Sequence, residues 1–275
     1  MVVMEIIFLG TGTSHGVPMI DCMIDGNTRC RKNVCRLSET DPRHRRTRSS
    51  IIVAWGGMNV LVDASPDFRA QVLREKILRI DAALITHSHA DHIGGIPDLR
   101  SYDRSRAKPL PLYGSPESVA TIRSTYRYIF DPDAFVGGGI PSIDATAVTG
   151  PFWLFGERVT PIPVGHGALA GCRGFRMGPL VYIPDLKTID DAGIEACRGA
   201  DTLILNCLRE SPEHVSHLTL AQSMDLAAKI APRQCFFTHL SHDIHYGIDG
   251  AKLEPWMHFA FDGLRVSIPL SGLHS

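Results

Sequence analysis

Short apolar runs recur along the chain, and residues that favour turns separate them. Runs of this length that are rich in β-branched residues are typical of strands buried within a sheet. They predict strands at residues 5–9, 50–55, 59–63, 81–86, 110–113, 159–164, 180–183, 202–206, 234–238 and 264–268.

Segments with a longer apolar spacing predict helices between these strands. The segment 220–230 carries apolar residues that include Leu220, Met224 and Ala227, a spacing that places them on one side of an amphipathic helix. Further helices are expected at 68–75, 116–128 and 190–197. This mixture of strands and helices predicts an α/β (α+β) chain.

One stretch departs from the alternation of strands and helices. Between residues 130 and 152 the chain is rich in Gly, Ala, Thr and Pro, including three consecutive glycines at 137–139. Such residues are typical of loops. We expect residues 1–275 to form a single domain with a loop insertion around residues 130–152.

Composition narrows the class of protein. A chain of 275 residues can bury one substantial core, and a net charge of −1 provides no general attraction to nucleic acid or anionic membranes. No long apolar run predicts a membrane span, and the start lacks the basic residues of a signal peptide. Seven cysteines, an odd number, suggest reduced thiols. We therefore expect a cytoplasmic protein.

A histidine-rich stretch follows the run at 81–86. It contains His87, His89, Asp91 and His92. Because side chains alternate along a strand, His87 and His89 point the same way, whereas Asp91 and His92 turn away as the chain enters a loop or helix. Imidazoles suit zinc, iron and manganese, and a carboxylate offers oxygen and can also handle a proton. The pattern predicts a site for two adjacent metals, in preference to a solvated loop.

This stretch resembles the His-x-His-x-Asp-His signature of the metallo-β-lactamase superfamily, a hydrolase fold with a dinuclear metal centre. The other site residues of that superfamily come in a fixed chain order, and matching residues follow predicted strands here in the same order: Asp63, His166, Asp185 and His239. The resemblance covers nearly the whole chain. It implies a four-layer αββα sandwich.

The resemblance also implies how the ligands are shared. One metal would be held by His87, His89, His166 and Asp185. The other would be held by Asp91, His92, His239 and the same Asp185, which bridges the two. Asp63 would orient ligands without touching metal.

Each residue also has an ordinary structural role open to it. His166 lies between two glycines, as in a turn. Asp185 follows Pro184 and could cap a helix. His239 could be a hydrogen-bonded core histidine, and Asp63 an ordinary residue at a strand end. Their shared order along the chain favours the metal site.

Two further segments bear on the substrate. The glycines at 10, 12 and 16 follow the first predicted strand and allow a tight turn, with close approach either to a ligand phosphate or to the metal-bearing loops. His217 lies just before the helix at 220–230, where phosphodiesterase branches of the superfamily place a general acid. Histidine suits this role because its pKa lies near neutrality. His214 is a rival, and capping of the helix is the structural alternative.

A second cluster of metal-binding residue types comprises Cys22, Cys30, Cys35 and His242. It resembles the structural zinc site of the phosphoribosyl cyclic phosphodiesterases of phosphonate breakdown, which also share the opening loop and the Thr238–His242 element. That family spaces its cysteines as Cys-x-Cys-x-x-Cys, whereas seven and then four residues intervene here. Three thiolates and one imidazole can coordinate a zinc ion tetrahedrally. The alternative is that the three cysteines are free thiols in a surface loop.

The basic run at residues 43–48 contains Arg43, Arg45, Arg46 and Arg48. Guanidinium groups bind phosphate oxygens well, so the run could contact a substrate. More often such a run is the solvated entry to a strand.

The resemblance implies a metal-dependent phosphodiesterase. A hydroxide held between two divalent ions, zinc or manganese with iron as a further option, would attack phosphorus while His217 protonates the departing ribose oxygen and Asp91 assists at the metal. A third, structural zinc would occupy the cysteine site. The expected substrate is a small cyclic ribose phosphodiester, such as phosphoribosyl 1,2-cyclic phosphate or a 2',3'-cyclic nucleotide.

Several alternatives remain open. A transfer-RNA 3'-processing endonuclease shares these features but carries a dense basic arm, which this chain lacks; long nucleic acid is therefore not the expected partner. A glyoxalase-type thiolesterase shares the ligands without the His217 element. A non-catalytic binding or carrier protein, such as the relative in pyrroloquinoline quinone biosynthesis, lacks a full ligand set. We expect a small phosphorylated ribose or nucleotide as partner and no membrane, and leave open a homodimer.

Overall fold

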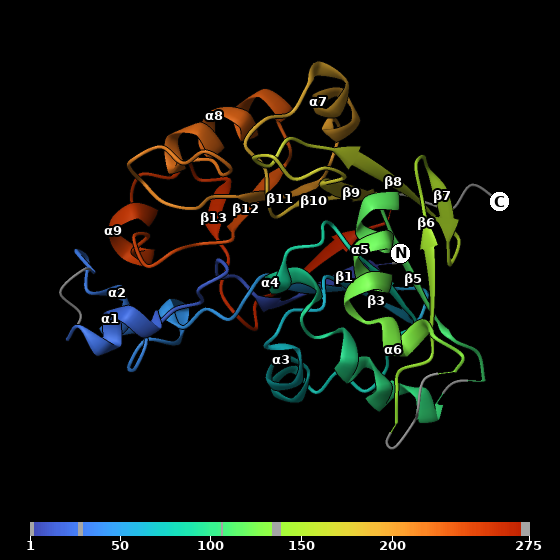
Figure 1. The fold of residues 1–275 in the computed structure, drawn as a ribbon. Helices are drawn as coiled ribbons and strands as arrows, with labels where there is room; N and C mark the ends of the chain where they lie inside the picture. Colours follow the sequence, from blue (N-terminus) through green and yellow to red (C-terminus); the bar gives the residue numbers. More distant parts are fainter. Residues whose placement is uncertain (1–2, 27–29, 106, 134–138, 271–275) are drawn as a thin grey trace.

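A computed structural model describes residues 3–26, 30–105, 107–133 and 139–270 and places their strands in two sheets (Figure 1). The first has the order β14-β1-β2-β3-β4-β5-β6. Its strands are β1 (Val3–Gly10), β2 (Ser50–Trp55), β3 (Met58–Val62), β4 (Ala82–Leu84), β5 (Leu110–Gly114), β6 (Ile143–Ala147) and β14 (Arg265–Pro269).

The second sheet has the order β13-β12-β11-β10-β9-β8-β7. Its strands are β7 (Phe152–Leu154), β8 (Glu157–Pro163), β9 (Arg173–Met177), β10 (Leu180–Ile183), β11 (Thr202–Asn206), β12 (Gln234–Thr238) and β13 (Met257–Phe259). Each sheet is antiparallel in one half and parallel in the other, with β3 to β6 and β10 to β13 forming the parallel halves.

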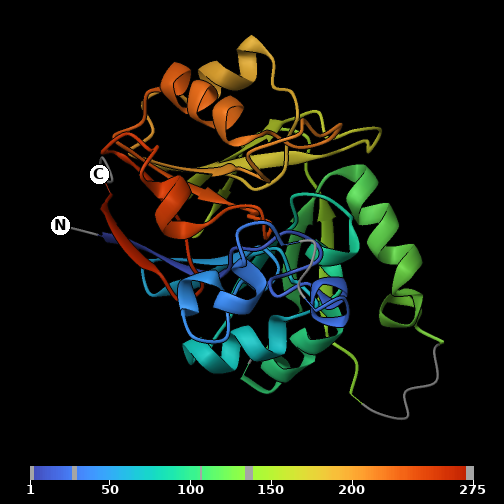
Figure 2. The ribbon, with the colours of Figure 1, turned by 90° about the vertical axis from the view of Figure 1, so that its left-hand side faces the viewer.

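Helices cover the outer faces of both sheets. One face carries α3 (Phe68–Glu75), α5 (Pro116–Thr125), α6 (Arg127–Phe130) and the 3-10 segment Ile96–Ser105, and the other carries α7 (Asp191–Cys197) and α8 (Leu220–Ile230) (Figures 1 and 2). Shorter helices are α1 (Ile20–Ile24), α2 (Val34–Leu37), α4 (Ala90–Ile93), α9 (Tyr246–Gly250) and the 3-10 turn Pro42–His44. The expected αββα sandwich is confirmed.

The strands are continuous apolar runs in the sequence because the core covers them on both faces. Ile6 and Phe8 of β1 face the opposite sheet, in a cluster with Tyr182 and Phe236, whereas the intervening Ile7 and Leu9 pack under α3. A strand covered on both faces buries every side chain, so alternation with polar residues disappears. Within the described residues, no helix combines the length and apolar character needed to cross a bilayer.

The strands missed by the sequence pattern are short, polar or at sheet edges. We expected residues 130–152 to form a loop insertion, but they include β6, so the prediction was wrong for this part. β6 pairs with β5 at the edge of its sheet, and an edge strand needs few apolar residues. Residues 134–138 of the same stretch lie outside the described residues. Arg173 and Arg176 interrupt the apolar pattern of β9, so the sequence did not predict this strand. Both guanidinium groups donate to backbone carbonyls of neighbouring segments. The helix expected at 116–128 is broken at Tyr126 into α5 and α6.

Candidate metal centre and catalytic site

The predicted ligands come together at one end of the sandwich, where loops leave strands of both sheets. Asp63 follows β3, the stretch from His87 to His92 follows β4 and enters α4, Asp185 follows β10, and His239 follows β12. These four strands lie in the parallel halves, whose carboxyl ends meet at the same edge. His166 comes from the loop after β8.

The first group of ligand atoms joins His87, His89 and His166, which offer ring nitrogens within 4.8 Å of one another. Nε2 of His87 lies 3.0 Å from Nδ1 of His89. Nδ1 of His166 is 2.8 Å from the carbonyl oxygen of Ser216, so it carries the proton and leaves Nε2 free to bind an ion.

The second group joins Asp91, His92 and His239. Oδ2 of Asp91 lies 3.3 Å from Nε2 of His92 and 3.6 Å from Nε2 of His239. Asp185 lies between the two groups: its Oδ2 is 3.1 Å from His92 Nε2, and its Oδ1 is 3.1 Å from His239 Nε2 and 4.0 Å from His166 Nε2. The structure thus brings together all seven residues predicted as ligands.

Unpartnered polar atoms fit a pair of divalent cations at this position. Nε2 of His92, Nε2 of His239 and Oδ2 of Asp185 are buried and make no hydrogen bond within the described part of the chain. Leaving such atoms without a partner costs free energy unless an ion binds them. Imidazole nitrogens and carboxylate oxygens are ligands that zinc and manganese accept.

Burial and mutual charge set the protonation of the site. Burial, assisted by the charge of His92, holds the pKa of His87 well below its usual range, which favours the neutral ring that binds metal. Although burial opposes ionisation of Asp185, His239 and His92 hold its pKa well below the ordinary value. Burial also opposes protonation of His92, but Asp91 and Asp63 together raise its pKa well above the usual value. An ion bound at His92 therefore displaces a proton.

Asp63 lies behind the site, as expected for an orienting residue. Its Oδ1 accepts from the Thr86 backbone at 2.8 Å, and its Oδ2 accepts from the Thr86 hydroxyl at 2.8 Å. Oδ2 also lies 2.8 Å from Nδ1 of His92. Asp63 and His239 adopt the left-handed backbone region, with φ of 63° and 60°. Non-glycine residues occur rarely there, and functional sites often hold them in this strained form.

His217 lies at the edge of the same cluster, in the segment before α8. Its Nδ1 is 3.4 Å from Oδ1 of Asp185 and 3.3 Å from Nδ2 of Asn206, and its ring stacks on His239 with centroids 4.7 Å apart. With His166 and Asp185 it also forms a group able to hold a metal. Burial, followed by the charge of His239, lowers the pKa of His217 to about 2. Its rival His214 instead contacts the Ser216 hydroxyl at 3.1 Å.

Thr219, and not His217, caps the N-terminus of α8, so capping does not explain why a histidine stands at position 217. The Thr219 hydroxyl accepts from the Gln222 backbone, and the Gln222 side chain accepts from the Thr219 backbone, which completes a capping box. Asn206, which sequence reasoning missed, accepts from the Leu218 backbone at 2.9 Å and so fixes the segment carrying His217. The signal was a polar residue ending the apolar run 202–206.

The glycine-rich opening loop braces the metal-bearing loops. A Cβ on Gly12 would lie 2.8 Å from the carbonyl oxygen of Arg46, so only glycine permits this packing. Thr13 and Leu240 are joined by a backbone hydrogen bond of 3.3 Å, and Leu240 donates to Thr11 at 2.8 Å. The loop therefore supports the residue that follows His239. Ser14 and His15 at its tip line a cleft of about 220 Å³ that His217 also lines.

The basic run at residues 43–48 is solvated only in part, because Arg43 and Arg45 are exposed and Arg46 is not. Arg46 is buried, and its guanidinium donates to the carbonyl oxygens of Ser241 at 2.6 Å and Ile244 at 2.9 Å. Arg43 pairs with Asp41, and Arg48 pairs with Asp67. The sequence pattern could not show the burial of Arg46 because the carbonyls that accept from it lie almost 200 residues away in the chain.

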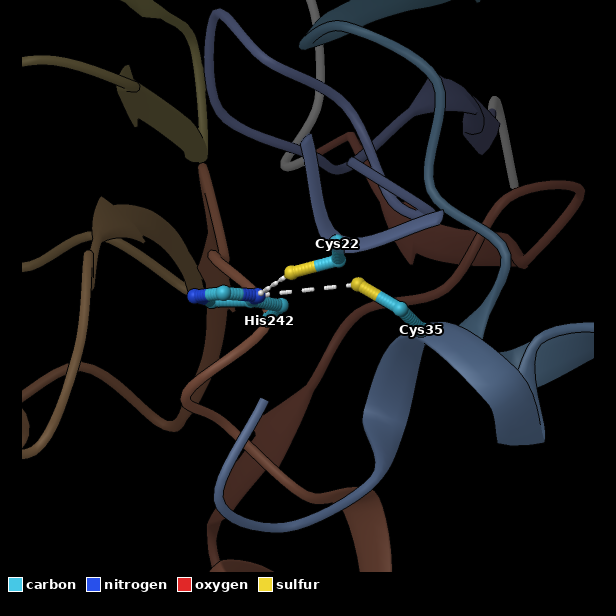
Figure 3. A group of neighbouring side chains, drawn as sticks. All are labelled: Cys22, Cys35 and His242. Carbon is cyan, nitrogen blue, oxygen red and sulfur yellow. Dashed lines mark hydrogen bonds between the residues drawn. The ribbon is translucent and has the colours of Figure 1, made fainter. Parts of the chain in front are cut away.

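The cysteine cluster borders the cleft that His217 lines, because His242 lines the same cleft. Figure 3 shows how its side chains lie. The sulfurs of Cys22 and Cys35 point to the same ring nitrogen of His242, Nδ1, at 3.0 and 3.6 Å. Cys22 lies on α1 and Cys35 on α2, so the packing of these short helices overcomes the loose spacing. Cys30 lies next to the group, with its Sγ 3.3 Å from the Cys35 backbone nitrogen and 3.8 Å from the His242 carbonyl oxygen. Three of the four expected ligands converge on one point.

Comparison with known proteins agrees with this geometry. A model of the β-lactamase superfamily domain matches residues 58–240. A curated relative from Porphyromonas gingivalis, named octanoyltransferase, is 34% identical over 275 residues, which are 98% of this chain and 53% of the relative. The chain thus spans about half the length of that relative.

Solved structures extend the comparison. A diphosphatase described as belonging to the PhnP family is 36% identical, with a TM-score of 0.85 over 97% of this chain and 98% of that protein. The Zn²⁺-bound PqqB of Methylobacterium extorquens shares the fold, with 22% identity and a TM-score of 0.75 over 95% of this chain and 99% of that protein. The chain belongs to the metallo-β-lactamase superfamily.

Proposed function

We propose that this protein is a phosphodiesterase that hydrolyses a small cyclic ribose phosphodiester, such as phosphoribosyl 1,2-cyclic phosphate or a 2',3'-cyclic nucleotide. The observation that carries the proposal is the position of His217, whose Nδ1 lies 3.4 Å from the Asp185 carboxylate at the junction of the two ligand groups. A histidine at the edge of a dinuclear site, and lining a cleft, is placed to handle the proton of a leaving group. The similar solved structure is described as a diphosphatase from the PhnP family, which supports phosphate chemistry at this site.

The proposed cofactors are two divalent ions, zinc or manganese. His87, His89 and His166 would hold one ion, and Asp91, His92 and His239 would hold the other. Asp185 would bind both. When bound, such ions supply a nucleophilic water at neutral pH and neutralise charge on phosphoryl oxygens. The chain fixes the ligands through neighbours: Asp63 holds the His92 ring, and the Ser216 carbonyl holds the His166 ring. Asp91 faces His92 and His239, where its carboxylate can accept a proton as well as bind metal.

His217 donates the proton to the departing ribose oxygen in this proposal. Burial lowers the pKa of its ring to about 2 in the metal-free chain. A bound diester is anionic, and a nearby negative charge favours the protonated imidazole, so substrate opposes that shift. Asn206, 3.3 Å from His217 Nδ1, restricts the orientation of the ring.

A third, structural zinc is proposed at Cys22, Cys35 and His242, with Cys30 completing the set. Burial raises the pKa of Cys35 to about 12 in the metal-free chain, so a bound cation is needed to stabilise the thiolate. This ion would join α1 and α2 to the loop after His239.

The test is hydrolysis by the purified, metal-analysed protein of phosphoribosyl 1,2-cyclic phosphate and 2',3'-cyclic nucleotides, with precursor transfer RNA and a glutathione thioester as the competing substrates. We expect turnover of a cyclic phosphodiester, lost on chelation and restored by zinc or manganese. The matched control is His89→Ala, which should lose both metal and turnover. Cleavage of only the RNA, or of only the thioester, would contradict the proposal.

A further inference from the structure

Arg46 is a buried arginine that the proposed phosphate chemistry does not use. Its side chain is 1% exposed, and its guanidinium donates to the carbonyl oxygens of Ser241 at 2.6 Å and Ile244 at 2.9 Å. These two residues lie on either side of His242, the imidazole of the cysteine cluster. The guanidinium therefore holds the loop of His242 from both sides.

The backbone of Arg46 contacts the segment that leads to the cysteines. Its amide donates to the Val17 carbonyl at 2.9 Å, and its carbonyl accepts from the Val17 amide at 2.8 Å. Val17 packs in one buried cluster with Cys22, Cys30 and Cys35. Arg46 thus joins the two segments that supply the sulfurs and the imidazole.

The positive charge of Arg46 has no carboxylate partner. Within the part of the chain that the structure describes, no carboxylate lies at ion-pair distance from its guanidinium, and its Nε is buried without a hydrogen bond. Burial lowers the pKa of Arg46 to about 10, so the side chain still carries its proton at neutral pH. Because a buried charge without a counter-ion costs free energy, this position favours a negative charge nearby.

The carboxylates around Arg46 are engaged with other cations. The groups whose negative charge would most stabilise the Arg46 cation are two carboxylates and two cysteines. Of the carboxylates, Asp262 forms an ion pair with Arg74 at 3.4 Å, and Asp249 forms one with Lys32 at 2.7 Å. The two cysteines remain.

These cysteines, Cys207 and Cys35, differ in whether a metal can ionise them. Burial raises the pKa of Cys207 to about 12, and this residue belongs to no metal-binding group of the described residues, so it stays a neutral thiol. Cys35 belongs to the proposed zinc set, where it would bind as a thiolate. Three thiolates and one zinc ion together keep one negative charge, which the single positive charge of Arg46 would balance.

We propose that Arg46 is a positioning residue of the cysteine zinc site, which fixes the loop of His242 and supplies the buried positive charge that balances the zinc-bound thiolates. This inference rests on the proposed structural zinc and does not depend on the substrate of the dinuclear centre. A residue that supports a metal site from behind changes the affinity for the ion without touching it.

Cobalt distinguishes this site from the dinuclear centre. The proposed ligands of that centre include no sulfur, so a thiolate-to-cobalt charge-transfer band can arise only at the cysteine cluster. Titration of the metal-depleted full-length chain with Co²⁺, followed by displacement with zinc, measures both affinities of the site. We expect Arg46→Met to weaken them about 10- to 100-fold. Arg46→Lys, which keeps the charge but cannot span both carbonyls, should fall between Arg46→Met and the wild type.

The matched control is Arg176→Met. Arg176 also donates to two backbone carbonyls, those of Ala196 at 2.9 Å and Arg198 at 2.6 Å, and its strand β9 lies away from α1 and α2 (Figure 1). This variant should lose stability but keep the cobalt affinity of the wild type. An equal loss of affinity in Arg176→Met and Arg46→Met would assign the effect to general destabilisation and overturn the inference.

A measurement on the wild type does not depend on whether the variants fold. Removal of zinc should speed the hydrogen exchange of the Arg46 guanidinium, followed by NMR, because the carbonyls beside His242 lose their fixed positions. Unchanged exchange, or an unchanged cobalt affinity in folded Arg46→Met, would overturn the inference and leave the zinc site standing. A wild type without the thiolate band would remove the zinc site itself, and the inference with it, whatever the result for phosphodiesterase activity.

Discussion

Oδ2 of Asp63 lies 2.8 Å from Nδ1 of His92, and both side chains are fully buried. The contact joins the end of β3 to the first turn of α4 and leaves Nε2 of His92 facing Asp91 and Asp185. A carboxylate behind a ligating histidine fixes the ring orientation and increases the basicity of the free nitrogen. Asp63 thereby determines how one ligand of the proposed centre is presented.

Asp63→Asn should weaken metal binding without removing a ligand. The amide keeps the size of the side chain but carries no negative charge to favour the correct ring form. We expect metal affinity to fall about 10- to 100-fold, the range typical of residues that support a ligand from behind. Competition with a chromophoric chelator measures the affinity. An unchanged affinity would show that Asp63 supports the fold alone.

His217→Ala should slow the turnover of cyclic phosphodiesters while the metal content stays constant. Loss of a positioned general acid typically reduces the rate about 10²- to 10⁴-fold. A substrate with a p-nitrophenol leaving group needs less protonation, so its turnover should fall much less. His214→Ala is the matched control. Metal loss in His217→Ala would make this residue a ligand, as its grouping with His166 and Asp185 also permits.

Cys22→Ala should lower the metal content by one equivalent per chain and lower thermal stability. The ion at this site would join α1 and α2 to the loop that carries His242, so its loss removes a link between these short helices and that loop. Cys197→Ala, which removes a buried thiol at the end of α7, is the control and should retain all the metal. Equal metal content in both variants would indicate free thiols at Cys22 and Cys35.

Acid should destabilise the fold through His44. Burial, followed by the charge of Arg46, lowers the pKa of His44 to about 4 from its ordinary 6.5. A depressed pKa means that the unfolded chain binds the proton more tightly, so the stabilisation is complete above pH 6.5 and disappears as the pH falls through 4. The full difference between the His44 pKa values of the unfolded and folded chains corresponds to about 3 kcal/mol of unfolding free energy.

Chemical denaturation between pH 7 and 4 measures this effect against His44→Gln, in which an amide oxygen can still accept from the Tyr246 backbone as His44 Nε2 does. We expect the variant to lose less stability over this interval than the wild type. The exposed His258→Gln provides the control. Identical pH profiles for all three proteins would exclude His44 as the source.

The residue pattern predicted most of the strands that build both sheets, and the resemblance to the superfamily implied the order of the candidate metal ligands. Apolar runs such as 180–183 and 202–206 mark strands because complete burial leaves no room for polar side chains, and they coincide with β10 and β11. Asp63, Asp185 and His239 were matched to the superfamily's site residues because each comes at a strand end in the expected order after or before the stretch from His87 to His92.

Only the tertiary structure revealed the features of the fold that depend on contacts between residues distant in the chain. Strands β6, β7 and β13 form at sheet edges, where pairing with a neighbour stabilises them without a strong apolar pattern. Arg46 resembles a solvated residue in the sequence, yet it is buried because carbonyls almost 200 residues later accept its protons.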